Sequence, residues 1–183
     1  MRLELHQVRL EKAMNVYYPN IKKIGLKDTL DTISYPTKGL YKCRIIFDSV
    51  IRKIEFIPYI RREINSLKLV ETKIESRTYK LEDRSEFELA FSQRTNCDDV
   101  LLVKNGLLTD TSYCNIALYD GENWYTPVKP LLYGVNREQL IKENQLIEKE
   151  IKLEELVNFQ QICLFNAMLE FGELIFDVSS IYP

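Results

Sequence analysis

Histidine is almost absent from this sequence of 183 residues, since His6 is its only copy. Metal centres built from paired histidine ligands and histidine-based catalytic triads are therefore nearly excluded. The four cysteines show no Cys-x-x-Cys spacing, so the sequence predicts no zinc site and no other metal site. No apolar run reaches the roughly 18 residues that a membrane helix needs, and we expect no membrane partner.

An excess of charge of one sign is also lacking. The chain has 25 Lys and Arg residues against 27 Asp and Glu residues, and its net charge is -2. This balance provides no electrostatic footprint for nucleic acid. No apolar signal segment follows Arg2 and Glu4, which predicts a cytoplasmic protein. Cys43, Cys114 and Cys163 lie in apolar segments and are expected to be buried small hydrophobes rather than catalytic or disulfide-bonded residues.

What is present is a globular composition, with 45% hydrophobic residues and a length sufficient for one large domain or two small ones. Helical periodicity and then a period of two predict a small α+β domain over residues 1–76. Its predicted helices and strands are residues 3–14, 26–33, 40–47, 51–57 and 67–72.

A larger α/β domain is predicted over residues 77–183. The Asn105-Gly106 pair is the strongest short signal for a hairpin turn in the chain. The helices predicted here are residues 85–94, 137–147 and 153–159, and the strands include residues 100–103, 116–118, 124–125, 162–165 and 174–176.

Two side chains in this chain are candidates for chemistry. Lys80 lies where the two predicted domains meet. It is either an ordinary solvated lysine or, if buried at the junction, a nucleophile toward an aldehyde. Asp110 lies among hydroxyl side chains between two predicted strands. It is either a loop acid that Thr111 or Ser112 satisfies, or a fixed carboxylate that meets a protonated ring nitrogen.

A third candidate is the turn of residues 130–137, which contains Gly134 and enters a predicted helix. The N-terminus of a helix offers unpaired N–H groups and a positive dipole, which suit a phosphate group. The turn fits neither the Gly-x-Gly-x-x-Gly pattern nor the nucleotide P-loop, so an ordinary helix start is the alternative interpretation.

Taken in order, these segments resemble a known family. The motifs are His6-x-x-Arg9-Leu10, Lys80-x-x-x-Arg84, Asp98-Asp99-Val100-Leu101-Leu102-Val103, Gly106-x-x-Thr109-Asp110-x-x-x-x-Asn115-Ile116, Thr126-Pro127 and Leu132-x-Gly134-Val135-x-Arg137. They are similar to class IV aminotransferases, the fold-type-IV enzymes that use pyridoxal 5'-phosphate (PLP). The resemblance implies an α/β protein of the D-amino-acid aminotransferase type, with PLP between a small α+β domain and a larger α/β domain, and a homodimer.

The resemblance also implies roles for residues at matching positions. Lys80 would form the Schiff base with PLP and then shuttle the α-proton of the substrate. Asp110 stands where the family usually has Glu and would pair with the pyridine nitrogen. Arg9 would bind the cofactor phosphate, and the N–H groups of Val135 and Asn136 would complete the phosphate site.

The branch of the family is predicted from residues 165–168, Phe-Asn-Ala-Met, where transaminases tend to have Thr-Gly-Thr. The Asn-Ala pair is similar to aminodeoxychorismate lyases, in which Asn166 would make the last phosphate contact. Such an enzyme converts 4-amino-4-deoxychorismate to 4-aminobenzoate and pyruvate in folate biosynthesis, and the lysine serves as its base. An amino-acid transaminase and a non-catalytic relative are the alternatives.

Three further expectations concern the small domain. Arg44 is the candidate that meets the substrate carboxylates, although strand alternation could equally place it in solvent. His6 lies three residues before Arg9 on a predicted helix and could orient that side chain. Family members usually have a β-hairpin before this helix. Met1 lies only a few residues before His6. Either the start codon is misassigned, or the sequence is truncated, or the small domain lacks the usual N-terminal hairpin and has an open sheet edge.

Overall fold

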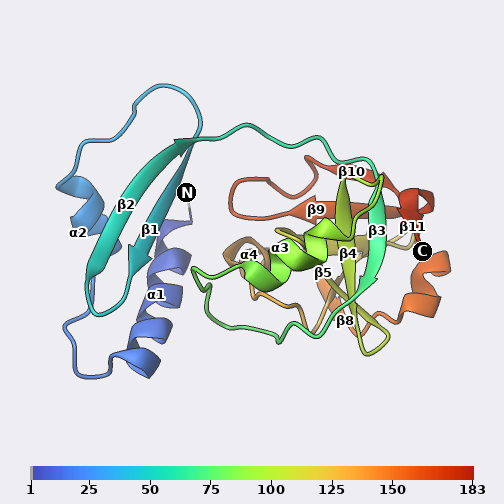
Figure 1. Cartoon of the computed structure of the whole chain (residues 1–183), viewed down its shortest axis with the longest axis horizontal. Helices are drawn as coiled ribbons and strands as arrows, with labels where there is room; N and C mark the ends of the chain where they lie inside the picture. The colour runs from blue at the N-terminus through green and yellow to red at the C-terminus, as the bar shows by residue number, and fades with distance from the viewer. Residues whose placement is uncertain (1) are drawn as a thin grey trace. The chain divides into compact units, whose positions relative to one another are not determined.

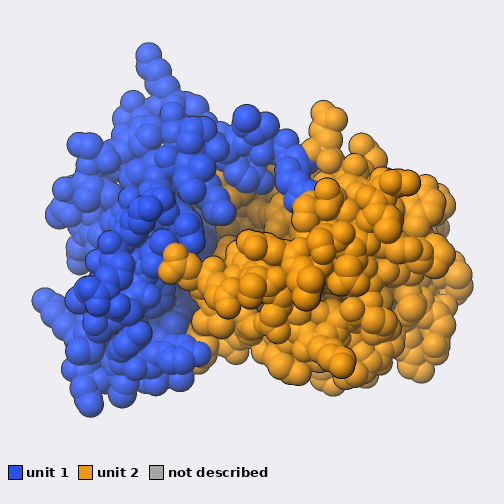
Figure 2. Space-filling view, in the orientation of Figure 1, with its two compact units in different colours: residues 1–62 blue, residues 63–183 orange. Residues whose placement is uncertain are grey.

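The computed structural model describes residues 2–183, and the chain divides into two compact units, Met1–Arg62 and Glu63–Pro183. Figures 1 and 2 show the elements and the two units. The boundary lies at Arg62, before the position near residue 76 that apolar density indicated. The reason is that strand β3 (Leu67–Glu71) pairs with strands of the second unit, whereas we expected it to be the third strand of the small domain.

The first unit contains two helices and an antiparallel pair of strands (Figure 1). These elements are α1 (Leu3–Tyr17), α2 (Leu26–Asp31), β1 (Tyr41–Phe47) and β2 (Ile51–Pro58). Leu10 and Met14 of α1 are buried against Leu26 of α2, with Ile45 and Phe47 of β1 packed on them. The helical periodicity of the N-terminal segment therefore predicted the face of α1 that packs on the rest of the unit.

In the second unit, β3 belongs to a four-stranded sheet of order β11-β3-β4-β5. The other strands are β4 (Asp99–Lys104), β5 (Leu107–Thr111) and β11 (Ile181–Tyr182). Strands β3 and β4 are parallel, and β4 and β5 form the hairpin that Asn105-Gly106 predicted. Both turn residues have positive φ, 53° and 75°, as a tight hairpin turn requires.

A second sheet in this unit has the order β10-β9-β6-β7-β8. Its strands are β6 (Asn115–Tyr119), β7 (Trp124–Pro127), β8 (Ile147–Lys149), β9 (Gln161–Phe165) and β10 (Ile175–Asp177). The helical elements of the unit are α3 (Ser85–Ser92), α4 (Val135–Lys142), and the 3-10 helices η1 (Leu153–Asn158) and η2 (Val178–Ser180).

The two sheets pack face to face, with α3 on the outer face of one and α4 on the outer face of the other. Leu101 of β4 and Ile116 of β6 belong to one core cluster between the sheets. Leu102 of β4 packs instead with Ala90 of α3, and Ala117 of β6 packs with Leu140 of α4. Strands β4 and β6 are thus buried on both faces, which explains their continuous apolar sequences.

Some predicted elements differ from the structure. Helix α4 ends at Lys142 rather than continuing to Ile147, because Asn144 adopts a φ of 56° and the N–H of Gln145 donates to the carbonyl of Leu140. The segment after Leu153 forms a 3-10 helix rather than an α-helix. Cys43 is exposed on β1, whereas Cys114 and Cys163 are buried as expected.

Candidate active site

Asp110 lies near the end of β5 and is 3% exposed. Its Oδ2 accepts a hydrogen bond of 2.9 Å from the N–H of Leu132, and its Oδ1 accepts one of 2.9 Å from Nδ2 of Asn115. Burial raises the pKa of Asp110 to about 6, although these hydrogen bonds act in the opposite direction. Asp110 is therefore a strand residue whose partners lie elsewhere in the chain, and Thr111 and Ser112 do not satisfy it.

The segment that carries Lys80 is attached at both ends to the surroundings of Asp110. On one side, the N–H of Arg77 donates to the carbonyl of Leu131 at 2.7 Å. On the other, Nη2 of Arg84 donates to the carbonyl of Ser112 at 2.6 Å. These two contacts attach residues 77–84 to the segment of Leu131 and Leu132 and to the β5–β6 connection, both of which lie next to Asp110.

Lys80 itself has an exposed side chain. In the sequence it falls within the second unit, after the boundary at Arg62. The segment of Lys80 is held at both ends, and the role that the family resemblance implies for this lysine stays a prediction.

Helix α4 begins with the predicted Gly-containing turn. Gly134 is its N-cap residue, and no side chain among the described residues caps the helix there. Val135 and Asn136, the first two helical residues, are both buried. Their N–H groups lie at the positive end of the helix dipole, which makes this terminus a favourable anion site.

Asn136 and Asn166 hold this terminus to the end of β9. Nδ2 of Asn136 donates to the carbonyl of Asn166 at 2.9 Å, while Oδ1 of Asn136 is buried without a hydrogen-bond partner in residues 2–183. Oδ1 of Asn166 accepts from the N–H groups of Met168 and Leu169 in its own turn, and its Nδ2 donates to Sγ of Cys114 at 3.1 Å. The phosphate contact expected of Asn166 thus stays a prediction.

The predicted arginines of the first unit each have a neighbour within that unit. Nη2 of Arg9 lies 3.3 Å from Nδ1 of His6, which confirms the expected pairing of these residues on α1. Arg44 of β1 lies opposite Glu55 of β2, and their charged groups are 3.3 Å apart. A substrate carboxylate at Arg44 would therefore have to compete with Glu55.

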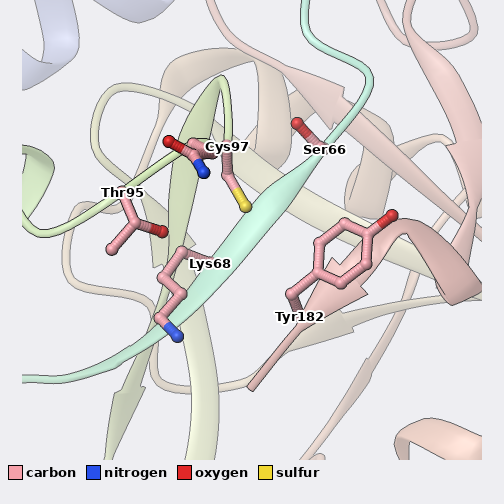
Figure 3. Close-up of a pocket in the computed structure, with 6 residues that line it drawn as sticks. Ser66, Lys68, Thr95, Cys97 and Tyr182 are labelled. Atoms are coloured by element: carbon pink, nitrogen blue, oxygen red, sulfur yellow. The ribbon is translucent and has the colours of Figure 1, made fainter.

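A surface pocket of about 370 Å³ lies apart from the residues described above (Figure 3). It is lined by Ser66, Lys68, Thr95, Asn96, Cys97 and Tyr182. The described residues contain no cluster of three or more His, Cys, Asp or Glu side chains that could hold a metal ion. Over the same residues, none of the helices combines the length and apolar character needed to cross a bilayer.

Three residues of this site received no role from the sequence. Asn115 contacts Asp110, Leu132 donates to Asp110, and Arg84 anchors the Lys80 segment. Asn115 and Arg84 belong to the same sequence motifs as Asp110 and Lys80, and this spacing could have indicated that they contribute to the site. Leu132 could not be found in this way, because its contribution is a backbone N–H.

The family of the protein follows from this fold and from direct comparison. Residues 60–174 match the family described as Amino-transferase class IV. The chain belongs to the class IV aminotransferase family, and its fold is that of the fold-type-IV enzymes. This family is PLP-dependent.

Individual relatives agree with this assignment. An uncharacterized protein of Haemophilus influenzae is 34% identical over 169 residues, which cover 91% of this chain and 89% of that protein. A crystal structure from Haemophilus somnus 129pt, provisionally named a 4-amino-4-deoxychorismate lyase, is 28% identical with a TM-score of 0.83, and the match covers 92% of this chain and 90% of that one. A Mycobacterium tuberculosis protein, named a hypothetical aminotransferase and solved with PLP bound, shares the fold at 14% identity and a TM-score of 0.72, over 94% of this chain and 74% of that one.

Proposed function

We propose that this protein is a PLP-dependent lyase that converts 4-amino-4-deoxychorismate to 4-aminobenzoate and pyruvate. The observation that carries the proposal is the buried Asp110 carboxylate, held by two donors beside the anchored segment of Lys80. An acid with so little exposure is costly to keep charged unless a cation meets it. A protonated ring nitrogen is such a cation.

The donor set of the chain fits PLP. Lys80 would bind the aldehyde, Asp110 would pair with the ring nitrogen, and the uncapped N–H groups of Val135 and Asn136 would hold the phosphate, with Arg9 and Asn166 as further phosphate contacts. The unpartnered Oδ1 of Asn136 lies at the same helix terminus. When bound, PLP supplies an electron sink for the negative charge that develops when a substrate C–H bond breaks.

The residues of this chain then have separate tasks. Asp110 stays ionised beside a cationic nitrogen and so favours the protonated ring, since an opposite charge lowers the pKa of a buried acid. The amine of Lys80 accepts one proton from the substrate and returns one, so no histidine is required. The N-terminus of α4 fixes one end of the cofactor through its phosphate, which orients the reacting carbon.

Three observations favour the lyase over an amino-acid transaminase. The Asn166-Ala167 pair replaces the Thr-Gly-Thr that is typical of transaminases, and the Haemophilus somnus protein carries the lyase name. In addition, the first unit has thirteen Lys and Arg residues but only six Asp and Glu residues, a net charge of +7, whereas the second unit has a net charge of -9. A positively charged unit suits a substrate with two carboxylates better than a zwitterionic amino acid.

The first experiment measures cofactor binding. The purified protein is titrated with PLP, its visible absorbance is recorded, and borohydride reduction is followed by peptide mapping of the modified lysine. We expect modification of Lys80, loss of this modification in Lys80→Ala, and its retention in Lys73→Ala, which removes an exposed lysine nearby. Unchanged absorbance in the wild-type protein, identical to that of Lys80→Ala, would refute PLP binding and favour a non-catalytic relative.

The second experiment distinguishes the two reactions. The loaded protein is incubated either with 4-amino-4-deoxychorismate or with an amino acid and 2-oxoglutarate. We expect 4-aminobenzoate and pyruvate from the first mixture and no transfer of the amino group in the second. The reverse result would assign the protein to the transaminases of the family.

A further inference from the structure

Asn115 closes a ring of hydrogen bonds with Asp110 and Leu132. Its Nδ2 donates to Oδ1 of Asp110 at 2.9 Å and to the carbonyl of Leu132 at 2.8 Å. The N–H of Leu132 in turn donates to Oδ2 of Asp110 at 2.9 Å. Because each carboxylate oxygen has its own donor, both the position and the plane of the carboxylate are restrained.

The other side of the Asn115 amide touches the turn at Gly134. A Cβ atom placed on Gly134 would lie 2.1 Å from Oδ1 of Asn115, so only glycine permits this approach. The φ of Gly134 is -73°, which any residue can adopt, and the requirement for glycine is therefore one of space. The side chain of Asn115 thus joins the Asp110 carboxylate to the residue that begins α4.

The backbone of Asn115 is itself held in place. It is the first residue of β6, it is paired with Phe165 of β9, and it is 7% exposed. A short, buried side chain on a paired strand has few rotamers open to it. Asn115 is therefore a rigid support for a carboxylate, and Asp110 keeps lone pairs free for a third partner.

We propose that Asn115 is a positioning residue of the active site, which orients the Asp110 carboxylate toward a cationic nitrogen and couples it to the phosphate-binding terminus of α4. This inference rests on the proposed PLP function, and it assigns Asn115 a task beyond filling the core. If Asn115 were merely structural, its substitution would lower the stability of the protein but would not change the affinity for PLP or its dependence on pH.

The test uses two substitutions and one control. Asn115→Leu removes the amide, and Asn115→Asp keeps the shape but places a second carboxyl beside Asp110. The control Asn158→Asp makes the same chemical change at an exposed position. For each full-length protein, the dissociation constant of PLP is measured from pH 5 to 9, and the thermal unfolding of the cofactor-free protein is recorded.

We expect Asn115→Leu to weaken PLP binding about tenfold or more, because it leaves a buried charge short of a donor. Asn115→Asp should bind PLP nearly as well as the wild type at low pH, where the two carboxyls share a proton, and progressively worse as the pH rises and both ionise. The control should follow the wild type. A PLP affinity within about twofold of the wild type at every pH, in a folded Asn115 variant, would overturn the proposal.

Failure of the proposed function is recognised separately. If the wild-type protein itself does not bind PLP, the role of Asn115 is judged from the titration of the Asp110 carboxyl by carbon NMR in the cofactor-free protein. A higher titration midpoint in Asn115→Leu than in the wild type supports the positioning role, because a donor to the ionised form has been lost. An identical midpoint refutes it.

Discussion

Nη2 of Arg84 donates a hydrogen bond of 2.6 Å to the backbone carbonyl of Ser112, and this contact attaches the Lys80 segment to the β5–β6 connection. Arg84 is partly buried, and its guanidinium lies 5.0 Å from the ring centre of Phe87. Since Arg84 is the residue before α3, one side chain joins that helix, the lysine segment and the connection that follows the strand of Asp110.

Replacing Arg84 should therefore loosen the Lys80 segment. We expect Arg84→Ala to increase proteolytic cleavage within residues 77–84 and to slow the attachment of PLP to Lys80 about tenfold, because the amine is less well positioned. Limited proteolysis and the time course of borohydride-trapped PLP measure the two effects. Arg52→Ala, which removes an exposed ion pair with Asp48, serves as the control and should change neither. Wild-type cleavage and attachment rates in Arg84→Ala would contradict the anchoring role.

Because Gly134 and Asn115 are in contact, we expect the effects of substitutions at these two positions on stability to depend on one another. We expect Gly134→Ala to lower the free energy of unfolding by about 1–3 kcal/mol, because the new methyl group must displace the Asn115 amide. In the background of Asn115→Ala, where that amide is absent, the same change should cost much less. Chemical denaturation of the four proteins of this double-mutant cycle gives the coupling energy. If the two substitutions change the free energy of unfolding additively, the predicted clash between the methyl group that Gly134→Ala adds and the Asn115 amide is wrong.

The raised pKa of Asp110 predicts how the stability of the cofactor-free protein depends on pH. The folded protein binds the Asp110 proton more tightly than the unfolded chain does, since burial raises the pKa from 3.8 to about 6. This stabilising contribution is complete below about pH 4 and is lost as the pH rises through 6, and its size is about 3 kcal/mol. We expect Asp110→Asn to remove it.

Unfolding free energies of the wild type and Asp110→Asn between pH 4 and 7 check this prediction. Their difference isolates Asp110 from exposed acids such as Asp120, whose pKa is lowered by hydrogen bonds from the N–H groups of Asn123 and Glu122. Asp120→Asn is the matched control, and it should leave the pH dependence between pH 4 and 7 nearly unchanged, because a lowered pKa confines the loss of its contribution to pH values below about 4. Parallel pH curves for the wild type and Asp110→Asn would contradict the raised pKa.

The charge difference between the units predicts a dependence on salt. We expect kcat/KM for a substrate with two carboxylates to fall severalfold between ionic strengths of about 0.01 and 0.15 M, because screening weakens its attraction to the positive first unit. Steady-state kinetics at several salt concentrations measure this. The double substitution of the exposed Lys22 and Lys23 by Gln should reduce the slope, and a rate independent of salt in the wild type would argue against electrostatic attraction of the substrate.

Local patterns in the sequence predicted much of the fold. The packed face of α1, the Asn105-Gly106 hairpin and the buried strand β9 all depend on residues that are close in the chain, so periodicity and turn chemistry were sufficient. The unit boundary was wrong for the opposite reason. Strand β3 finds its partners in β4 and β11, which lie far along the chain, and an apolar segment contains no information on its partner.

The same division applies to the candidate site. The family, together with the order of Lys80, Asp110 and the Gly134 turn, could be predicted from the sequence, because a motif consists of residue types at fixed spacings along the chain. Three features of the site became visible only in the folded protein: Asp110 is a buried strand residue, Asn115 and the peptide N–H of Leu132 hold it, and Lys80 is exposed. Burial and backbone hydrogen bonds arise when distant segments pack together, and no local pattern of side chains specifies them.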